Sequence, residues 1–257
     1  MQNDDEIVGR LLSRREVVAL LGISGVAAMA GPLLAQSTAP GRAGSLPACV
    51  VQPEQTEGPY FVDRMLNRSD IRTDPVTRAV KAGLPLQVAF TVSQIDASGA
   101  CSPLPGAQVD LWQCDAAGVY SGVQDANFNT VGQQFLRGYQ VTDAQGVAKF
   151  VTVYPGWYPG RAVHVHFKIR TAPAASQGYE FTSQLYFDEA VTDRVFAREP
   201  YAGRTGRRTR NEADRIFRSS GGPQLLLPVT EKADGCSGSF SLALHTGGAS
   251  RRTGRPA

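Results

Sequence analysis

Short runs of β-prone residues, separated by turn residues, occupy most of the chain from residue 85 onward. Turns such as Asp-Ala-Ala-Gly at 115–118 and Asp-Ala-Gln-Gly at 143–146 interrupt these runs. Such spacing predicts an all-β protein whose core is an antiparallel β-sandwich with long loops. The expected strands are 86–95, 107–113, 135–142, 148–154, 162–170, 183–187 and 237–244. A stretch with few apolar residues, 190–216, is expected to be a helical or irregular excursion on the surface of the sandwich.

One predicted strand alternates between polar and apolar positions over residues 163–169. A period of two places His164 and His166 on one face, with their backbones about 6–7 Å apart, and the apolar side chains on the other. Two imidazoles at that spacing can share one ion, so the pattern indicates half of a metal site. The alternative is that both histidines are simply the polar side of an amphipathic strand.

The first forty residues have the pattern of an export signal. Ser13-Arg14-Arg15 precedes a stretch of small and apolar residues, 17–34, and a polar, proline-containing segment follows. This order resembles a twin-arginine signal, which implies a periplasmic or secreted protein. Glycines and a proline dilute the apolar stretch, so no stable membrane span is expected after signal cleavage. We expect a signal peptide at 1–39, a β-sandwich domain at 40–246 and a flexible tail at 247–257.

The composition narrows the classes of function only slightly. The 257 residues are 42% hydrophobic and 19% charged, which suits one sizeable globular domain. The formal net charge is only +3, and the arginine-rich pieces at 204–210 and 251–255 contain no interleaved aromatic residues. Nucleic acid is therefore not expected as a partner.

Four cysteines allow three pairings into two disulfides, and export would place them in an oxidising compartment. No Cys-x-x-Cys pair is present, so a zinc site made of thiolates is not expected. Pairing Cys101 with Cys114 requires the loop at 103–106 to fold back, because the intervening strand is too long to bridge when straight. The connectivity of Cys49, Cys101, Cys114 and Cys236 stays open at this point.

A metal held by two histidines needs further ligands, and the sequence offers tyrosine. The chain has three histidines, and the third, His245, stands apart near a glycine-rich tail. Tyr158 lies in the turn before His164, and Tyr120 follows a turn after another strand, so both can converge on one end of the sandwich. A phenolate, with an ordinary pKa near 10, stays ionised at neutral pH only on a strongly Lewis-acidic ion, and ferric iron fits. Spacing alone does not select these two among eight tyrosines, most of which are expected in the core.

Five motifs, in the same order, resemble those of the intradiol ring-cleavage dioxygenases. They are Gln-Thr-Glu-Gly-Pro-Tyr at 55–60, and the segments 110–122, 135–139, 154–168 and 182–187. The resemblance extends from about residue 49 to 244 and is strongest to exported single-chain relatives of the protocatechuate 3,4-dioxygenase β subunit. The long N-terminal helical region of catechol 1,2-dioxygenases is absent, as is a second dioxygenase-like subunit. We therefore expect this chain to complete its substrate pocket alone or as a homo-oligomer.

The resemblance implies a cofactor and a reaction. The cofactor would be Fe(III), held by Tyr120, Tyr158, His164 and His166, with Tyr158 acting as ligand and base at once. The reaction would be cleavage of a catecholic aromatic by O2 between its two hydroxyl-bearing carbons, which gives a cis,cis-muconate-type product. Catechol, protocatechuate, hydroxyquinol and lignin-derived catechols all fit the motifs.

The same match assigns residues around the substrate. Arg161 would stabilise negative charge on the substrate ring, and Gln184 would be its polar neighbour in the pocket. Gly58 and Pro59 match a loop that packs against the aromatic substrate in the family, and Tyr60 would form part of the pocket wall.

Two other functions remain open from the residues alone. A secreted β-sandwich module could bind carbohydrate or an aromatic polymer on a stacking surface made by the tyrosines and Trp157. A copper or zinc ion at His164 and His166 could support different chemistry, and then the metal would not need Tyr120 or Tyr158.

Overall fold

The structure, a computed structural model, describes residues 49–171 and 178–245. The predicted signal peptide and the predicted tail lie outside the described residues, so their assignment stays a prediction. The strands are β1 (Pro85–Ile95), β2 (Cys101–Pro103), β3 (Gln108–Trp112), β4 (Arg137–Val141), β5 (Val147–Val153), β6 (His164–Arg170), β7 (Glu180–Tyr186), β8 (Val229–Lys232) and β9 (Gly235–His245). Between β7 and β8 lie α2 (Glu189–Phe196), the 3-10 turn η1 (Asn211–Ala213), α3 (Arg215–Ser219) and the 3-10 turn η2 (Gly222–Leu225). The predicted all-β sandwich is confirmed.

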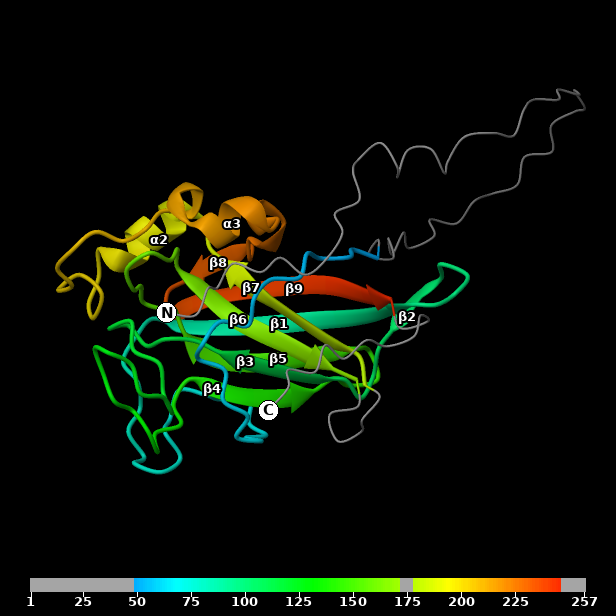
Figure 1. Ribbon diagram of the computed structural model, residues 1–257, viewed down its shortest axis with the longest axis horizontal. Helices are drawn as coiled ribbons and strands as arrows, with labels where there is room; N and C mark the ends of the chain where they lie inside the picture. Colours follow the sequence, from blue (N-terminus) through cyan, green and yellow to red (C-terminus); the bar gives the residue numbers. More distant parts are fainter. Residues whose placement is uncertain (1–48, 172–177, 246–257) are drawn as a thin grey trace, which may run out of the picture. The chain divides into compact units, whose positions relative to one another are not determined.

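Two sheets form the sandwich (Figure 1). The first has five strands, in the order β2-β1-β9-β8 with β5 also paired to β1, and the second has four, in the order β4-β3-β6-β7. Among the described strands the pairs are antiparallel except β1 with β9, the first and last strands of the sandwich, which lie side by side and run in the same direction. The prediction of antiparallel pairing therefore holds for all but this central pair.

The apolar faces of the two sheets meet in one core. Along β1 every second side chain from Leu86 to Val92 is buried, as expected for a strand with one side on a core. Phe90 lies with its ring centroid 5.1 Å from that of Phe167 on β6. Burying one such side chain contributes about 1.5–3 kcal/mol to folding. These contacts show that Phe167 and its same-face neighbours on β6 point toward the five-stranded sheet.

All seven residues of β6 are buried, so its other face is covered as well. That outward face carries His164, His166, Lys168 and Arg170. The covering comes from residues that precede β1: Lys168 lies over the ring of Phe61 at 4.3 Å, and Arg170 pairs with Asp63. The period-2 prediction for this strand is therefore confirmed, but its polar side faces protein.

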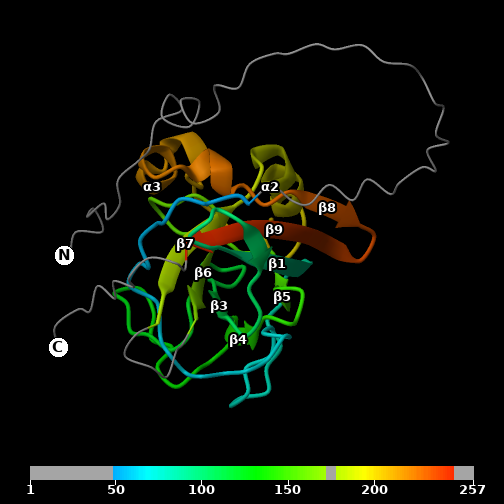
Figure 2. The same cartoon turned by 90° about the vertical axis from the view of Figure 1, so that its right-hand side faces the viewer.

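The segment expected as a surface excursion, 190–216, is more than that. Helices α2 and α3 lie above the strands in both views (Figures 1 and 2), and this part of the chain buries Val195, Tyr201 and Asp214. The expected helical or irregular structure is confirmed by α2, η1 and the start of α3, but the segment does not lie only on the surface: its few apolar residues point inward, and Asp214 is paired inside the protein. No helix in the described ranges is long and apolar enough to cross a membrane.

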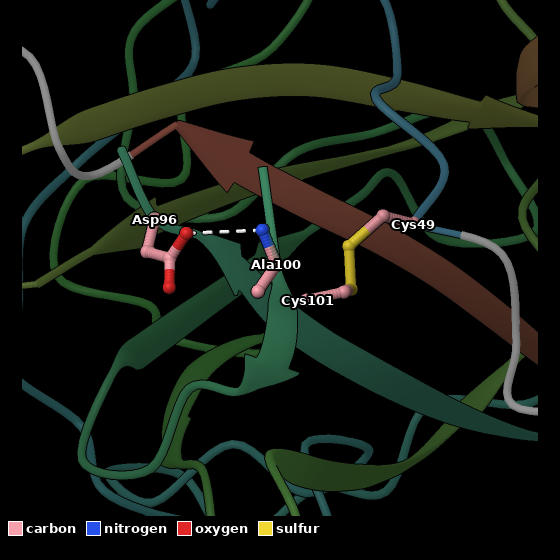
Figure 3. Close-up of a disulfide and its surroundings, with 4 residues drawn as sticks. All are labelled: Cys49, Asp96, Ala100 and Cys101. Atoms are coloured by element: carbon pink, nitrogen blue, oxygen red, sulfur yellow. Dashed lines mark hydrogen bonds between the residues drawn. A yellow bond between two sulfur atoms is a disulfide. The ribbon is translucent and has the colours of Figure 1, made fainter. Parts of the chain in front are cut away.

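The cysteines form a single described disulfide, Cys49–Cys101, with Cα atoms 5.9 Å apart. Figure 3 shows it beside the β1–β2 turn, where Asp96 Oδ1 accepts a hydrogen bond from the Ala100 amide at 2.9 Å. Cys114 and Cys236 are free thiols and buried. Of the pairings considered, the structure thus shows one that closes a long loop and ties residue 49 to the five-stranded sheet.

Candidate metal centre

The register of the four-stranded sheet gathers the centre around His164 and His166. His166 lies opposite Trp112 on β3 and Gln184 on β7, and His164 lies opposite Tyr186. Directly paired residues point to the same face of a sheet, so these side chains surround the two imidazoles. The Nε2 atoms of His164 and His166 lie 3.0 Å apart.

Two turns bring the predicted tyrosines to the same point. The hydroxyl of Tyr158 lies 3.1 Å from His164 Nε2, and that of Tyr120 lies 3.4 Å from the same atom. The two turns touch at Gly118, whose φ is +81° and where an added Cβ would lie 2.2 Å from the carbonyl oxygen of Trp157. Only glycine fits this left-handed, crowded position, so it allows the two tyrosines to converge.

Burial favours the neutral form of all four groups when no metal ion is bound. It holds the pKa of both His164 and His166 well below the usual value, with the charge of Arg161 adding to the effect. It also raises the pKa of Tyr120 and Tyr158, which for Tyr158 the guanidinium of Arg161 opposes. The site therefore consists of neutral imidazoles and of phenols that stay protonated even beside Arg161 and would ionise only on a bound metal ion.

The arrangement fits a bound metal ion better than a hydrogen-bonded cluster. His164 Nδ1 lies 2.6 Å from the carbonyl oxygen of Ala162, so Nδ1 carries the proton and Nε2 offers its single lone pair to three neighbours. Ligand atoms about 2.1 Å from one ion lie about 3.0–3.4 Å from each other at 90–109°, which is the observed spacing. In the described ranges no three His, Cys, Asp or Glu side chains gather at one point, so phenols are needed to complete a donor set. A ligand role for these residues stays a prediction that this geometry favours.

The two histidine rings are held in different ways. His164 donates through Nδ1 to the backbone, as described above. His166 instead stacks on Trp112, with ring centroids 5.0 Å apart and planes 10° from parallel, and its Nδ1 has no hydrogen-bond partner among the described residues. A hydrogen bond thus orients the His164 ring, whereas packing against Trp112 orients the His166 ring.

Arg161 and Gln184, both predicted around the substrate, contact each other. Arg161 Nη2 donates to Gln184 Oε1 at 2.5 Å, and the Gln184 amide nitrogen donates to the carbonyl of Thr56 at 2.9 Å. Burial alone would lower the pKa of Arg161, but the nearby Tyr158 and Tyr186 and the carboxylate of Asp214 raise it above its ordinary value. Arg161 is therefore a fixed positive charge beside the centre.

The predicted substrate loop lies against the centre. A Cβ added to Gly58 would approach His166 Cε1 to 3.3 Å, so the loop backbone passes close to that ring. Tyr60 stacks on Tyr120 with ring centroids 4.4 Å apart, and Pro59 is exposed at the turn. Glu57 pairs with Lys168, which anchors the loop to β6.

Sequence reasoning missed Asp214. Its side chain is completely buried and pairs with Arg161, at 3.0 Å between Oδ2 and Nε. The one signal in the sequence is an aspartate placed to cap the short helix α3, and that pattern does not indicate a partner 53 residues away.

Comparisons with known proteins agree with the resemblance in the motifs. A family model described as Dioxygenase matches residues 56–207, which is more than half of the chain. The protocatechuate 3,4-dioxygenase β chain of Burkholderia cepacia is 32% identical over 144 residues, which cover 51% of this chain and 59% of that one. The chain thus spans less than two thirds of that relative's length.

Solved structures match over a larger share. The intradiol ring-cleavage dioxygenase from Tetranychus urticae is 32% identical, with a TM-score of 0.66 and coverage of 77% of this chain and 95% of that chain. The dioxygenase domain of a dioxygenase carbohydrate-binding protein fusion from Streptomyces sp. SirexAA-E is 30% identical, with a TM-score of 0.55 and coverage of 76% and 98%. The chain belongs to the intradiol ring-cleavage dioxygenase family.

Proposed function

We propose that this protein is an Fe(III)-dependent dioxygenase that opens the ring of a catechol to a cis,cis-muconate-type product. The observation that carries the proposal is the convergence of two phenols and two neutral imidazoles on one buried point. Phenolate is a hard anionic ligand, and its ionisation in a buried site favours a strongly Lewis-acidic ion over copper(I) or zinc. Both atoms of O2 would enter the product, one in each new carboxylate, as the carbon–carbon bond between the hydroxyl-bearing carbons breaks.

Iron, when bound by Tyr120, Tyr158, His164 and His166, would supply the Lewis acidity that ionises the catechol and the means for the ring to react with O2. The two phenols differ in access: Tyr120 is completely buried, whereas Tyr158 is partly exposed. Tyr158 Oη is therefore the phenolate that can accept a proton from an incoming catechol hydroxyl, while Tyr120 stays in place.

Arg161 supplies the electrostatic part of the mechanism. Its guanidinium is largely buried, and its contacts to Gln184 and Asp214 hold it beside the centre. A preorganised cation in a water-poor site stabilises negative charge on the substrate ring without reorganising during the reaction. The backbone at Gly58 passes close to the His166 ring, which is 1% exposed, so this ring has little access to water.

A visible absorption spectrum of the purified protein, with metal analysis, tests the proposal. A phenolate bound to ferric iron should give a broad visible band with about one iron per chain, and anaerobic addition of catechol should shift it. Oxygen should then convert catechol to a muconate, and protocatechuate and hydroxyquinol in the same assay would rank the substrates. A protein that stays colourless after iron reconstitution would contradict the proposal.

The rival functions make different predictions in the same experiment. A copper or zinc enzyme would keep its metal in the Tyr120→Phe and Tyr158→Phe variants, whereas the iron site should lose the visible band. An open stacking surface for a polymer is disfavoured, because Trp157 is 8% exposed and Arg204 lies over its ring at 4.3 Å.

We also propose that the protein is exported by the signal expected at 1–39, and the Cys49–Cys101 disulfide supports an oxidising compartment. Cell fractionation tests this, with Arg14→Lys/Arg15→Lys as the variant that should remain in the cytoplasm. Equal distribution of the variant and the wild type would count against twin-arginine export.

A further inference from the structure

Asp214 connects a helix to the candidate metal centre. Its Oδ1 accepts hydrogen bonds from Ile216 N at 2.8 Å and Phe217 N at 3.3 Å, which caps α3. Its Oδ2 accepts from Arg161 Nε at 3.0 Å and from Ala162 N at 2.8 Å. One completely buried carboxylate therefore holds both the side chain of Arg161 and the backbone of the next residue.

The contact to Ala162 continues to a predicted metal ligand. The carbonyl oxygen of Ala162 lies 2.6 Å from Nδ1 of His164. With its amide held by Asp214 and its carbonyl held by His164, the Ala162 backbone has little freedom to turn. This fixes the proton of His164 on Nδ1 and directs the lone pair of Nε2 into the centre.

We propose that Asp214 is a positioning residue that sets both the guanidinium of Arg161 and the tautomer of His164. The effect of Asp214 on turnover rests on the proposed function. Its effect on the tautomer of His164 does not depend on that function. The opposite charge of Arg161 and four hydrogen bonds compensate the burial of the carboxylate, so its removal releases two site residues together.

The chain offers a matched control in Asp188. This residue caps α2 as Asp214 caps α3, accepting from Ala190 N and Val191 N, but it is exposed and contacts neither Arg161 nor Ala162. Serine is a good N-cap, so Asp214→Ser and Asp188→Ser keep helix capping. The two variants differ because only Asp214→Ser loses the carboxylate oxygen that accepts hydrogen bonds from Arg161 and Ala162.

The first readout is the tautomer of His164 in the metal-free, full-length protein, from long-range ¹H–¹⁵N spectra after selective ¹⁵N-histidine labelling. Three histidines in the chain make the spectrum assignable. We expect a protonated Nδ1 in the wild type and in Asp188→Ser, and a mixture of both tautomers in Asp214→Ser. The second readout is steady-state kinetics with catechol on the iron-loaded protein, where Asp214→Ser should lower kcat/KM by about 10–100-fold, mainly through kcat.

Loss of the single tautomer and of kcat in Asp214→Ser alone supports the proposal. An unchanged tautomer, with kinetics within twofold of Asp188→Ser, overturns it. If Asp214→Ser does not fold, Asp214→Asn keeps the side-chain shape and carries the same test. A wild type without iron or turnover would refute the proposed function, while the tautomer spectra would still decide the role of Asp214.

Discussion

In both sheets alternate side chains point toward the shared core and away from it. The face that points away from the core meets water on β1 and meets other protein segments on β6. On β1, in the five-stranded sheet, the outward position Gln87 is exposed and the inward neighbours Leu86 and Val88 are buried. On β6, in the four-stranded sheet, the outward position His166 is as buried as the inward Phe167. A period of two therefore reports which residues share a face, and it does not report whether that face meets water.

The difference has an energetic consequence. A polar side chain on an exposed face finds water, whereas one on the covered face of β6 needs a partner from the protein or a bound ion. Lys168 pairs with Glu57 and Glu180, and Arg170 pairs with Asp63 and Asp110. His164 and His166 have no acidic partner among their contacts with the described residues, and the proposed metal ion would fill that role.

The largest effect is expected from removing one histidine from each sheet. His166→Ala should lose the iron and reduce turnover by more than about 100-fold, because even the partners of metal ligands account for about 10–100-fold. His245→Ala, at the exposed end of β9, should keep both. Iron content and catechol cleavage measure the effect, and equal iron in the two variants would show that the covered face does not hold the metal.

A second test compares outward positions that bind no metal. Arg170→Met should lower the free energy of unfolding by about 3–5 kcal/mol, because it leaves Asp110 buried beside no cation. Gln87→Met, outward on β1, should change it by no more than about 0.5 kcal/mol. Urea unfolding gives both values, and the double variant Arg170→Met/Asp110→Leu should recover much of the loss. Similar losses in both single variants would mean that the two faces do not differ.

The sequence predicts the strands well where alternation is long. The runs at 86–95 and 162–170 correspond to β1 and β6, and the two-residue spacing of His164 and His166 places them together. The short strands β2 and β8 were not predicted, because three or four mostly exposed residues carry no hydrophobic pattern. Tyr120 and Tyr158 were selected by resemblance to a family, and their convergence on one atom is visible only in the fold.

Contacts between distant segments could not be predicted from local pattern. The Cys49–Cys101 disulfide was one of several open pairings, and Asp214 resembles any helix-capping aspartate in the sequence. Both depend on how loops cross the sandwich, which follows from packing of the whole domain. The covered face of β6 is therefore the part of the molecule that sequence periodicity describes least completely.

The smallest expected effect concerns Asp63, a carboxylate in the segment that covers β6. Burial alone would raise the pKa of Asp63, but its hydrogen bond to Arg170 and the charge of that residue hold the pKa below its ordinary value. A group with a lowered pKa in the folded state stabilises the protein above its unfolded pKa, about 3.9, and this contribution disappears as the pH falls through the folded pKa. Asp63→Asn should therefore cost less than about 1 kcal/mol at pH 7, since the pair is partly exposed, and progressively less as the pH falls through the folded pKa.

Asp96, on the β1–β2 turn of the other sheet, provides the matching measurement. Its pKa is also lowered, first by the Ser98 hydroxyl and then by the amide of Ala100, so no cation is involved. Urea midpoints of Asp63→Asn and Asp96→Asn against pH, at low and high NaCl, separate the two causes. Salt should shrink the effect of Asp63→Asn and leave that of Asp96→Asn unchanged, because only the former removes an ion pair. Equal salt dependence would mean that Arg170 does not stabilise Asp63 through its charge, and that Asp110 alone compensates Arg170 on the covered face.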